Sequence, residues 1–103
     1  MGNYISYNLN EKNEWQKCHS YNPGPLEDLP IFPEVSLLKY KIGDTFQVRY
    51  KYILRDCLVQ GIEIFYTFYA NQKNWNIYYD LRWGTGHNGG YFTFEQIDNM
   101  IIK

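Results

Sequence analysis

Apolar side chains recur at every second position in three successive runs between residues 46 and 83, and this period is that of a β-strand. The first run alternates Phe46, Val48, Tyr50, Tyr52 and Leu54 with Gln47, Arg49, Lys51, Ile53 and Arg55. The second alternates Ile62, Ile64, Tyr66 and Phe68 with Glu63, Phe65, Thr67 and Tyr69. The third alternates Trp75, Ile77, Tyr79, Leu81 and Trp83 with Asn76, Tyr78, Asp80 and Arg82. We therefore expect strands over 46–55, 62–69 and 75–83. The middle strand should be central, because both of its sides are partly apolar.

Short connections between these strands favour an antiparallel meander. The turn-like tetrapeptide 71–74 separates the second run from the third. A further strand is expected over 3–9, where Ile5, Tyr7 and Leu9 alternate with polar residues. The pattern indicates an α+β fold with a small antiparallel sheet of about four strands.

A short C-terminal helix is predicted over 94–102. Thr93 and Gln96 have the spacing of a capping box, and Phe94, Ile97 and Ile101 share one helical face. This helix is expected to pack against the sheet.

The stretch 10–33 is less regular. Asn10 to Cys18 predicts one or two helical turns, with Asn10 as N-cap and Trp15 and Cys18 on one face. Four prolines between residues 21 and 33 predict a loop, since proline fixes φ and removes a hydrogen-bond donor. The apolar residues of this loop are expected to hold it against the core; they are Leu26, Leu29, Ile31 and Phe32.

Length and composition indicate one soluble domain over 1–103. The chain is 45% hydrophobic and 20% charged, which excludes an intrinsically disordered chain.

No apolar run is long enough to span a membrane and no secretory signal is recognised, so a cytoplasmic location is expected. The first six residues fit the loose N-myristoylation pattern at Gly2, which also recurs by chance.

No metal, redox or cofactor chemistry is predicted. Cys18 and Cys57 are expected to be reduced thiols packed as small hydrophobic residues. Together with His19 and His87 they offer zinc-ligand types, but the close C-x-x-C spacing of a structural zinc site is missing.

Residues 84–89 match G-x-G-x-x-G after a predicted strand. The chain ends too soon for the second parallel strand and the acidic residue of a dinucleotide-binding unit. We therefore interpret this segment as a wide glycine-rich loop that leads into the helix, with recognition by the loop as the functional alternative. His87 could act as a general base oriented by Asp80 or Glu95, yet nothing places a nucleophile beside it.

A basic row is expected on one face of the first of these three strands. Arg49, Lys51 and Arg55 alternate there next to aromatic residues, a pattern found in nucleic-acid binders. Exposed cations on an edge strand also prevent edge-to-edge aggregation, and the net charge of −1 speaks against a dedicated nucleic-acid binder.

The function that these exclusions favour is non-enzymatic binding of another protein. Eleven tyrosines and three tryptophans exceed what a small core can bury, and both residue types dominate interface hot spots. A small inhibitor of the toxin-immunity or phage counter-defence kind fits this description. The candidate contact residues are Tyr78, Arg82, Trp83, His87, Asn88 and Tyr91. The alternatives are a nucleic-acid binder, a small-molecule or nucleotide binder using Gly84–Gly90, and a homodimer formed through the aromatic sheet face.

Overall fold

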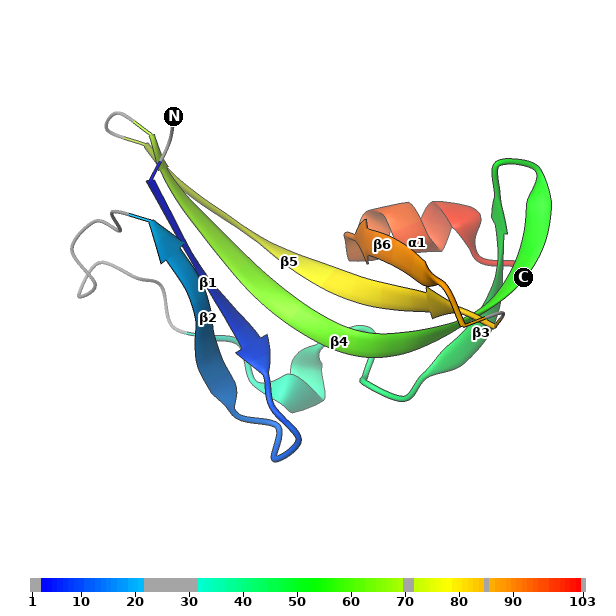
Figure 1. Cartoon of the computed structure of the whole chain (residues 1–103), viewed down its shortest axis with the longest axis horizontal. Helices are drawn as coiled ribbons and strands as arrows, with labels where there is room; N and C mark the ends of the chain where they lie inside the picture. Colours follow the sequence, from blue (N-terminus) through cyan, green and yellow to red (C-terminus); the bar gives the residue numbers. More distant parts are fainter. Residues whose placement is uncertain (1–2, 22–31, 70–71, 85, 103) are drawn as a thin grey trace. The chain divides into compact units, whose positions relative to one another are not determined.

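The computed structural model describes residues 3–21, 32–69, 72–84 and 86–102, apart from the side chains of residues 3, 68, 69 and 72–74 (Figure 1). The described elements are β1 (Asn3–Leu9), β2 (Trp15–Tyr21), the 3-10 helix η2 (Val35–Leu37), β3 (Thr45–Tyr50), β4 (Ile53–Tyr69), β5 (Gln72–Trp83), β6 (Asn88–Phe92) and α1 (Phe94–Met100). The strands are hydrogen-bonded in the order β2-β1-β4-β5-β6, and β3 also pairs with β4. The expected antiparallel sheet with a C-terminal helix is confirmed, but six strands are described where about four were predicted.

The chain divides into two units, which we describe separately. Unit 1 comprises Met1–Leu38 and Glu63–Ile77, and unit 2 comprises Lys39–Ile62 and Tyr78–Lys103. Strands β4 and β5 contribute residues to both units. Within the described residues, no helix is long and apolar enough to cross a membrane.

The core of unit 1 lies on one side of β1 and β4. Ile5 pairs with Tyr66, and both are buried together with Ile64. Partly buried residues surround this cluster: Tyr7, Trp15, Phe32 and Ile77. The strand predicted over 3–9 is thus confirmed, and its apolar residues face inward as the alternation requires.

Phe32 and Pro33 hold the end of the proline-rich segment against unit 1. The Phe32 ring centroid lies 4.8 Å from that of Tyr7, and the Trp15 Nε1–H donates to the Pro33 carbonyl at 3.2 Å. The predicted anchoring is therefore confirmed at Phe32. Leu26, Leu29 and Ile31 lie outside the described residues.

The helical turns predicted over 10–18 are wrong, because β1 and β2 form an antiparallel hairpin here (Figure 1). Asn10 does act as a cap, but for the hairpin loop: its Oδ1 accepts the backbone N–H groups of Lys12 and Glu14 at 2.9 and 3.0 Å. Asn13 has a φ of 61°, which asparagine tolerates in turns. Every β2 residue after Trp15 is exposed, so the strand carries no apolar alternation that the sequence could reveal.

A bulge interrupts the pairing of β2 with β1. Ser6 pairs with His19 and Tyr7 pairs with Lys17, so Cys18 is the extra residue. The fully buried Ser6 accepts the His19 N–H through its Oγ at 3.3 Å. Because Cys18 lies on this exposed strand, the expectation that it packs as a small hydrophobic residue is wrong.

The strand predicted over 46–55 is interrupted in unit 2. The chain turns at Lys51 and Tyr52, so β3 ends at Tyr50 and β4 begins at Ile53. Phe46, Val48 and Tyr50 do face the core, with Val48 fully buried. β4 is central, as predicted, although it begins well before residue 62.

The alternation of buried residues along β4 shifts by one position within unit 2. Cys57 and Val59 are buried at odd-numbered positions, whereas Ile62 is buried at an even-numbered one. The intervening Gly61 lies beside Asp80. This shift falls between Val59 and Ile62, and both apolar stretches of the strand are buried.

Strand β5 confirms its predicted alternation, because Tyr79, Leu81 and Trp83 are buried. It begins at Gln72, so part of the predicted turn over 71–74 belongs to the strand, while residue 71 lies outside the described residues.

Helix α1 begins at Phe94, as the sequence predicts, but ends at Met100, two residues before the predicted end. Thr93 Oγ1 accepts the Gln96 N–H at 3.2 Å, and the Gln96 side chain accepts the Thr93 N–H at 2.9 Å. Ile97 is fully buried, and the helix contacts β3 and β6. The helix is therefore held by both its capping box and its apolar face.

The wide loop predicted between the last strand and the helix is wrong. Gly86 N–H donates to the Trp83 carbonyl, and Trp83 N–H donates to the His87 carbonyl, both at 2.8 Å. These bonds turn the chain within a few residues and let β6 pair with β5. Glycine lacks a side chain to alternate, so the Gly89-Gly90 strand residues give no β signal.

Candidate binding surfaces

Four of the six predicted contact residues lie on one side of the sheet in unit 2. Tyr78 and Arg82 alternate with Trp83 along β5, and cross-strand pairing places Asn88 opposite Arg82 and Tyr91 opposite Asp80. We call this side of β3, β4, β5 and β6 in unit 2 the polar face.

The other two predicted contact residues lie elsewhere. His87 is exposed in the turn before β6. The Trp83 side chain is only 8% exposed, and its ring lies 5.6 Å from Tyr50 and 6.4 Å from Phe92. Trp83 therefore contributes to packing, on the side of the sheet opposite Arg82.

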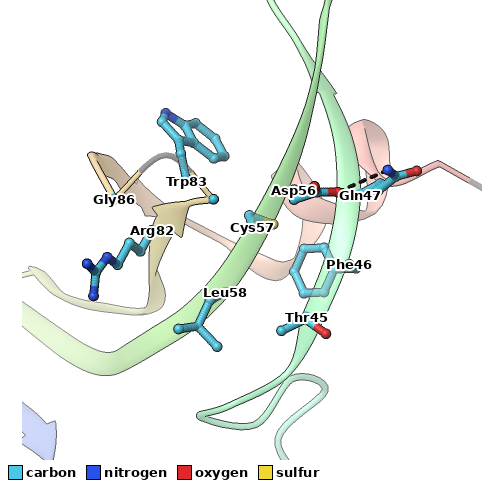
Figure 2. Close-up of a pocket in the computed structure, with 10 residues that line it drawn as sticks. Thr45, Phe46, Gln47, Asp56, Cys57, Leu58, Arg82, Trp83 and Gly86 are labelled. Carbon is cyan, nitrogen blue, oxygen red and sulfur yellow. Dashed lines mark hydrogen bonds between the residues drawn. The ribbon is translucent and has the colours of Figure 1, made fainter.

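A pocket of about 520 Å³ opens in unit 2 (Figure 2). Its lining residues come from β3, β4, the end of β5 and the turn after β5: Thr45, Phe46, Gln47, Asp56, Cys57, Leu58, Arg82, Trp83, Gly84 and Gly86. Arg82 lies on one side of Leu58 in this view, and the hydrogen-bonded Asp56 and Gln47 lie on the other (Figure 2).

The glycines of this pocket are already engaged through their backbone. Gly84 N–H donates to the Asp56 carbonyl at 2.8 Å, and Gly86 N–H donates to Trp83. Gly86 has a φ of 93°, a conformation that favours glycine. These two N–H groups are thus not available to bind a phosphate. Phosphate binding was the function that the glycine motif suggested.

The turn between β3 and β4 presents a cluster of exposed apolar residues. We call residues 51–54 the hairpin tip. Tyr52 is 96% exposed, Ile53 is 52% exposed and Leu54 is 55% exposed. Lys51 and Tyr52 have φ values of 52° and 66°, in the left-handed region where residues other than glycine are uncommon.

Lys51 belongs to the hairpin tip and Arg49 and Arg55 lie next to it in the sequence, but these cations do not form the row predicted from the sequence. Arg49 pairs with Leu54 across the hairpin, whereas Arg55 pairs with the buried Val48. Paired residues share a side of the sheet, so Arg49 and Arg55 lie on opposite sides. The prediction of one basic face through all three residues is therefore wrong.

Arg55 and Lys51 lie against aromatic rings. The Arg55 guanidinium is 5.3 Å from the Trp83 ring, and Lys51 Nζ is 5.3 Å from the Tyr50 ring. Arg55 Nε is buried and has no hydrogen-bond partner among the described residues. The sequence contains no acidic residue between Asp44 and Asp56, so the hairpin is locally basic.

Both cysteines are free thiols in different environments. Cys18 is exposed, while burial raises the pKa of Cys57 from its ordinary 9.0 to about 11.

In the part of the chain that the structure describes, no three His, Cys, Asp or Glu side chains gather in a way that could hold a metal ion.

Sequence reasoning missed the hairpin tip because the alternation continues through it. One signal was present: apolar Ile53 falls among the polar residues Arg49 and Lys51 of the same register.

Comparison of the chain with protein-family models, curated proteins and solved structures gave no match.

Proposed function

We propose that this chain is a non-enzymatic protein-binding module that inserts its hairpin tip into a cleft of another protein and covers the surface around it. The observation that carries the proposal is Tyr52, a large aromatic side chain that is 96% exposed at a turn with left-handed φ. A small inhibitor of the toxin-immunity or phage counter-defence kind is the class we favour.

The left-handed φ of Lys51 and Tyr52 costs conformational free energy, and a hairpin with other residues at this turn would avoid that cost. A two-residue β-turn of this kind is best served by Asn-Gly, and a bulky residue there costs on the order of 1 kcal/mol. Strained residues of this kind cluster at functional sites. Lys51 and Tyr52 therefore lower the stability of the hairpin, and their turn exposes the Tyr52 side chain.

Tyr52 is the side chain of the tip that suits an interface hot spot. Tyrosine is enriched at such sites and loses few rotamers on binding. Tyr50 pairs directly with Ile53, so the tip is already ordered before any partner arrives. Pre-organisation lowers the entropic cost of association.

The test is capture of a partner from a lysate of the native host, using the tagged chain and the variant Lys51→Asn/Tyr52→Gly. We expect the unchanged chain to retain one protein in a stoichiometric complex and the variant to lose it. Tyr21→Ala is the matched control, because Tyr21 is also an exposed tyrosine but lies on β2. Equal capture by the turn variant, or recovery of the chain alone, would overturn the proposal.

Nucleic acid is the second candidate, because Arg49, Lys51 and Arg55 lie on the same β3–β4 hairpin as the exposed Tyr52. This reading predicts that a single-stranded oligonucleotide binds and that its affinity falls steeply with salt. Fluorescence anisotropy with the unchanged chain and Lys51→Gln measures this. A salt-sensitive signal that Lys51→Gln weakens would replace the protein partner with a nucleic acid.

A cytosolic site of action belongs to the same proposal. Cys18 is exposed and free, and exposed thiols persist most readily where the environment is reducing.

A further inference from the structure

We propose that the pocket in unit 2 binds a short zwitterionic peptide, with the peptide carboxylate at Arg82 and its ammonium group at Asp56. This site is separate from the hairpin tip and does not depend on what the tip binds. The proposal rests on which charges line the pocket, which of their hydrogen-bonding groups are already engaged, and how large the pocket is.

Arg82 supplies the anion-binding end. Its side chain is exposed, and it has no hydrogen-bond or ion-pair partner among the described residues. A Cβ at Gly86 would stand 3.6 Å from Arg82 Nη2, so the guanidinium lies against the turn at the rim of the pocket. The guanidinium fork matches a carboxylate through two parallel hydrogen bonds.

Asp56 supplies the cation-binding end. Its Oδ1 accepts a hydrogen bond from Gln47 Nε2 at 2.9 Å, and its backbone carbonyl accepts from Gly84. These two bonds hold Asp56 in place on the side of Leu58 opposite Arg82 (Figure 2). The second carboxylate oxygen remains to accept from an ammonium group.

The lining excludes ligands that carry one sign of charge. Asp56 would repel a phosphate. The Gly84 and Gly86 N–H groups already donate hydrogen bonds to backbone carbonyls and so cannot bind one. Arg82 would in turn repel a polyamine. A ligand with a negative end and a positive end satisfies both side chains at once.

Size and the remaining lining favour a peptide over a single amino acid. A volume of about 520 Å³ lies within the range of small-molecule pockets and exceeds what one amino acid fills. Thr45 and the free amide oxygen of Gln47 can bond to peptide N–H groups, and Leu58 provides an apolar contact in the middle.

The experiment is an NMR titration of the ¹⁵N-labelled chain with three ligands of similar size. Triglycine has both charges, N-acetyl-triglycine lacks the ammonium group and triglycinamide lacks the carboxylate. We expect triglycine to shift the amides of residues 56–58, 82–84 and 86, and to bind roughly three to ten times more tightly than either blocked peptide, as partly exposed charge pairs allow.

Two variants assign each end of the ligand. Arg82→Gln should bind triglycine and triglycinamide equally, and Asp56→Asn should bind triglycine and N-acetyl-triglycine equally. Glu95→Gln, an exposed change on α1, is the control that leaves all affinities as they were. The proposal is overturned if no amide shifts, if the three peptides bind alike, or if inorganic phosphate or maltotriose produces the shifts in their place.

Discussion

The Trp83 indole lies against the backbone of Gly89, where a Cβ would stand 2.8 to 3.0 Å from three ring carbons. Gly89 is the extra residue of a bulge in β6, because Leu81 pairs with Gly90 and Arg82 pairs with Asn88. The bulge and the missing side chain together make room for the ring. Trp83 can then pack against Tyr50 and Phe92.

Gly89→Ala should destabilise the fold by about 1 to 3 kcal/mol, since the methyl group must displace a buried ring or the strand. Urea unfolding followed by tryptophan fluorescence measures the change. Gly61→Ala is the matched control: its Cβ would meet Asp80 at 3.5 Å, an ordinary contact, and should cost much less. Equal losses at both glycines would contradict this account of Trp83.

The elements that the sequence predicted are those whose apolar residues face a core at a regular spacing. β1 and β5 show this at Ile5 and Leu81, and α1 shows it at Ile97. β2 and β6 were missed because one is almost wholly exposed and the other contains two glycines. Hydrophobic periodicity cannot report a strand that buries little or has no side chains to alternate.

The candidate site was predicted in part for the same reason. Alternation along β5 correctly separates Arg82 from Trp83, but the sequence could not show that cross-strand pairing brings Asn88 and Tyr91 to the same side. The Lys51-Tyr52 turn was missed, because neither residue belongs to the group that favours left-handed φ and the apolar Ile53 was the one sequence signal of it. The pairing of Tyr50 with Ile53 locates the turn.

Lys51→Asn/Tyr52→Gly should raise the free energy of unfolding by about 1 to 2 kcal/mol. Asn-Gly adopts this turn without the steric penalty that a lysine and a tyrosine carry. Thermal and urea unfolding measure the gain. Tyr52→Ala removes the same ring but keeps a Cβ at the left-handed position, so it should not be stabilised to this extent. A loss of stability in the Asn-Gly variant would show that the Tyr52 ring supports the fold.

Ser6→Ala should destabilise unit 1 by about 1 to 3 kcal/mol. The buried hydroxyl accepts the His19 N–H at the bulge, and its removal leaves that donor without this partner. Ser20→Ala on the exposed β2 is the control and should lie within about 0.5 kcal/mol of the unchanged chain. Hydrogen exchange at the His19 amide offers a second readout, because it should quicken in Ser6→Ala alone.

Thiol labelling of the native chain should modify Cys18 and leave Cys57 intact. Cys18 is exposed on β2, whereas Cys57 is 3% exposed and burial keeps its thiol protonated. At neutral pH we expect one equivalent of a disulfide reagent to react rapidly, and the second to react only after denaturant is added. Cys18→Ser should abolish the rapid phase. Rapid loss of both thiols would mean that the core around Cys57 opens readily.

The fold should lose stability in alkaline solution, beginning near pH 9. Burial raises the pKa of Cys57 from 9.0 to about 11 and that of Tyr66 from 10.0 to about 12. Burial and Asp98 also raise the pKa of Tyr40. Above pH 9 the unfolded chain releases these protons before the folded chain does, so the free energy of unfolding falls as pH rises toward 11 and 12. Cys57 alone should account for roughly 2 to 3 kcal/mol of this loss. Urea unfolding at a series of pH values tests it, and Cys57→Ala should show a smaller decline between pH 9 and 11. An identical decline in that variant would assign the alkaline loss to the tyrosines.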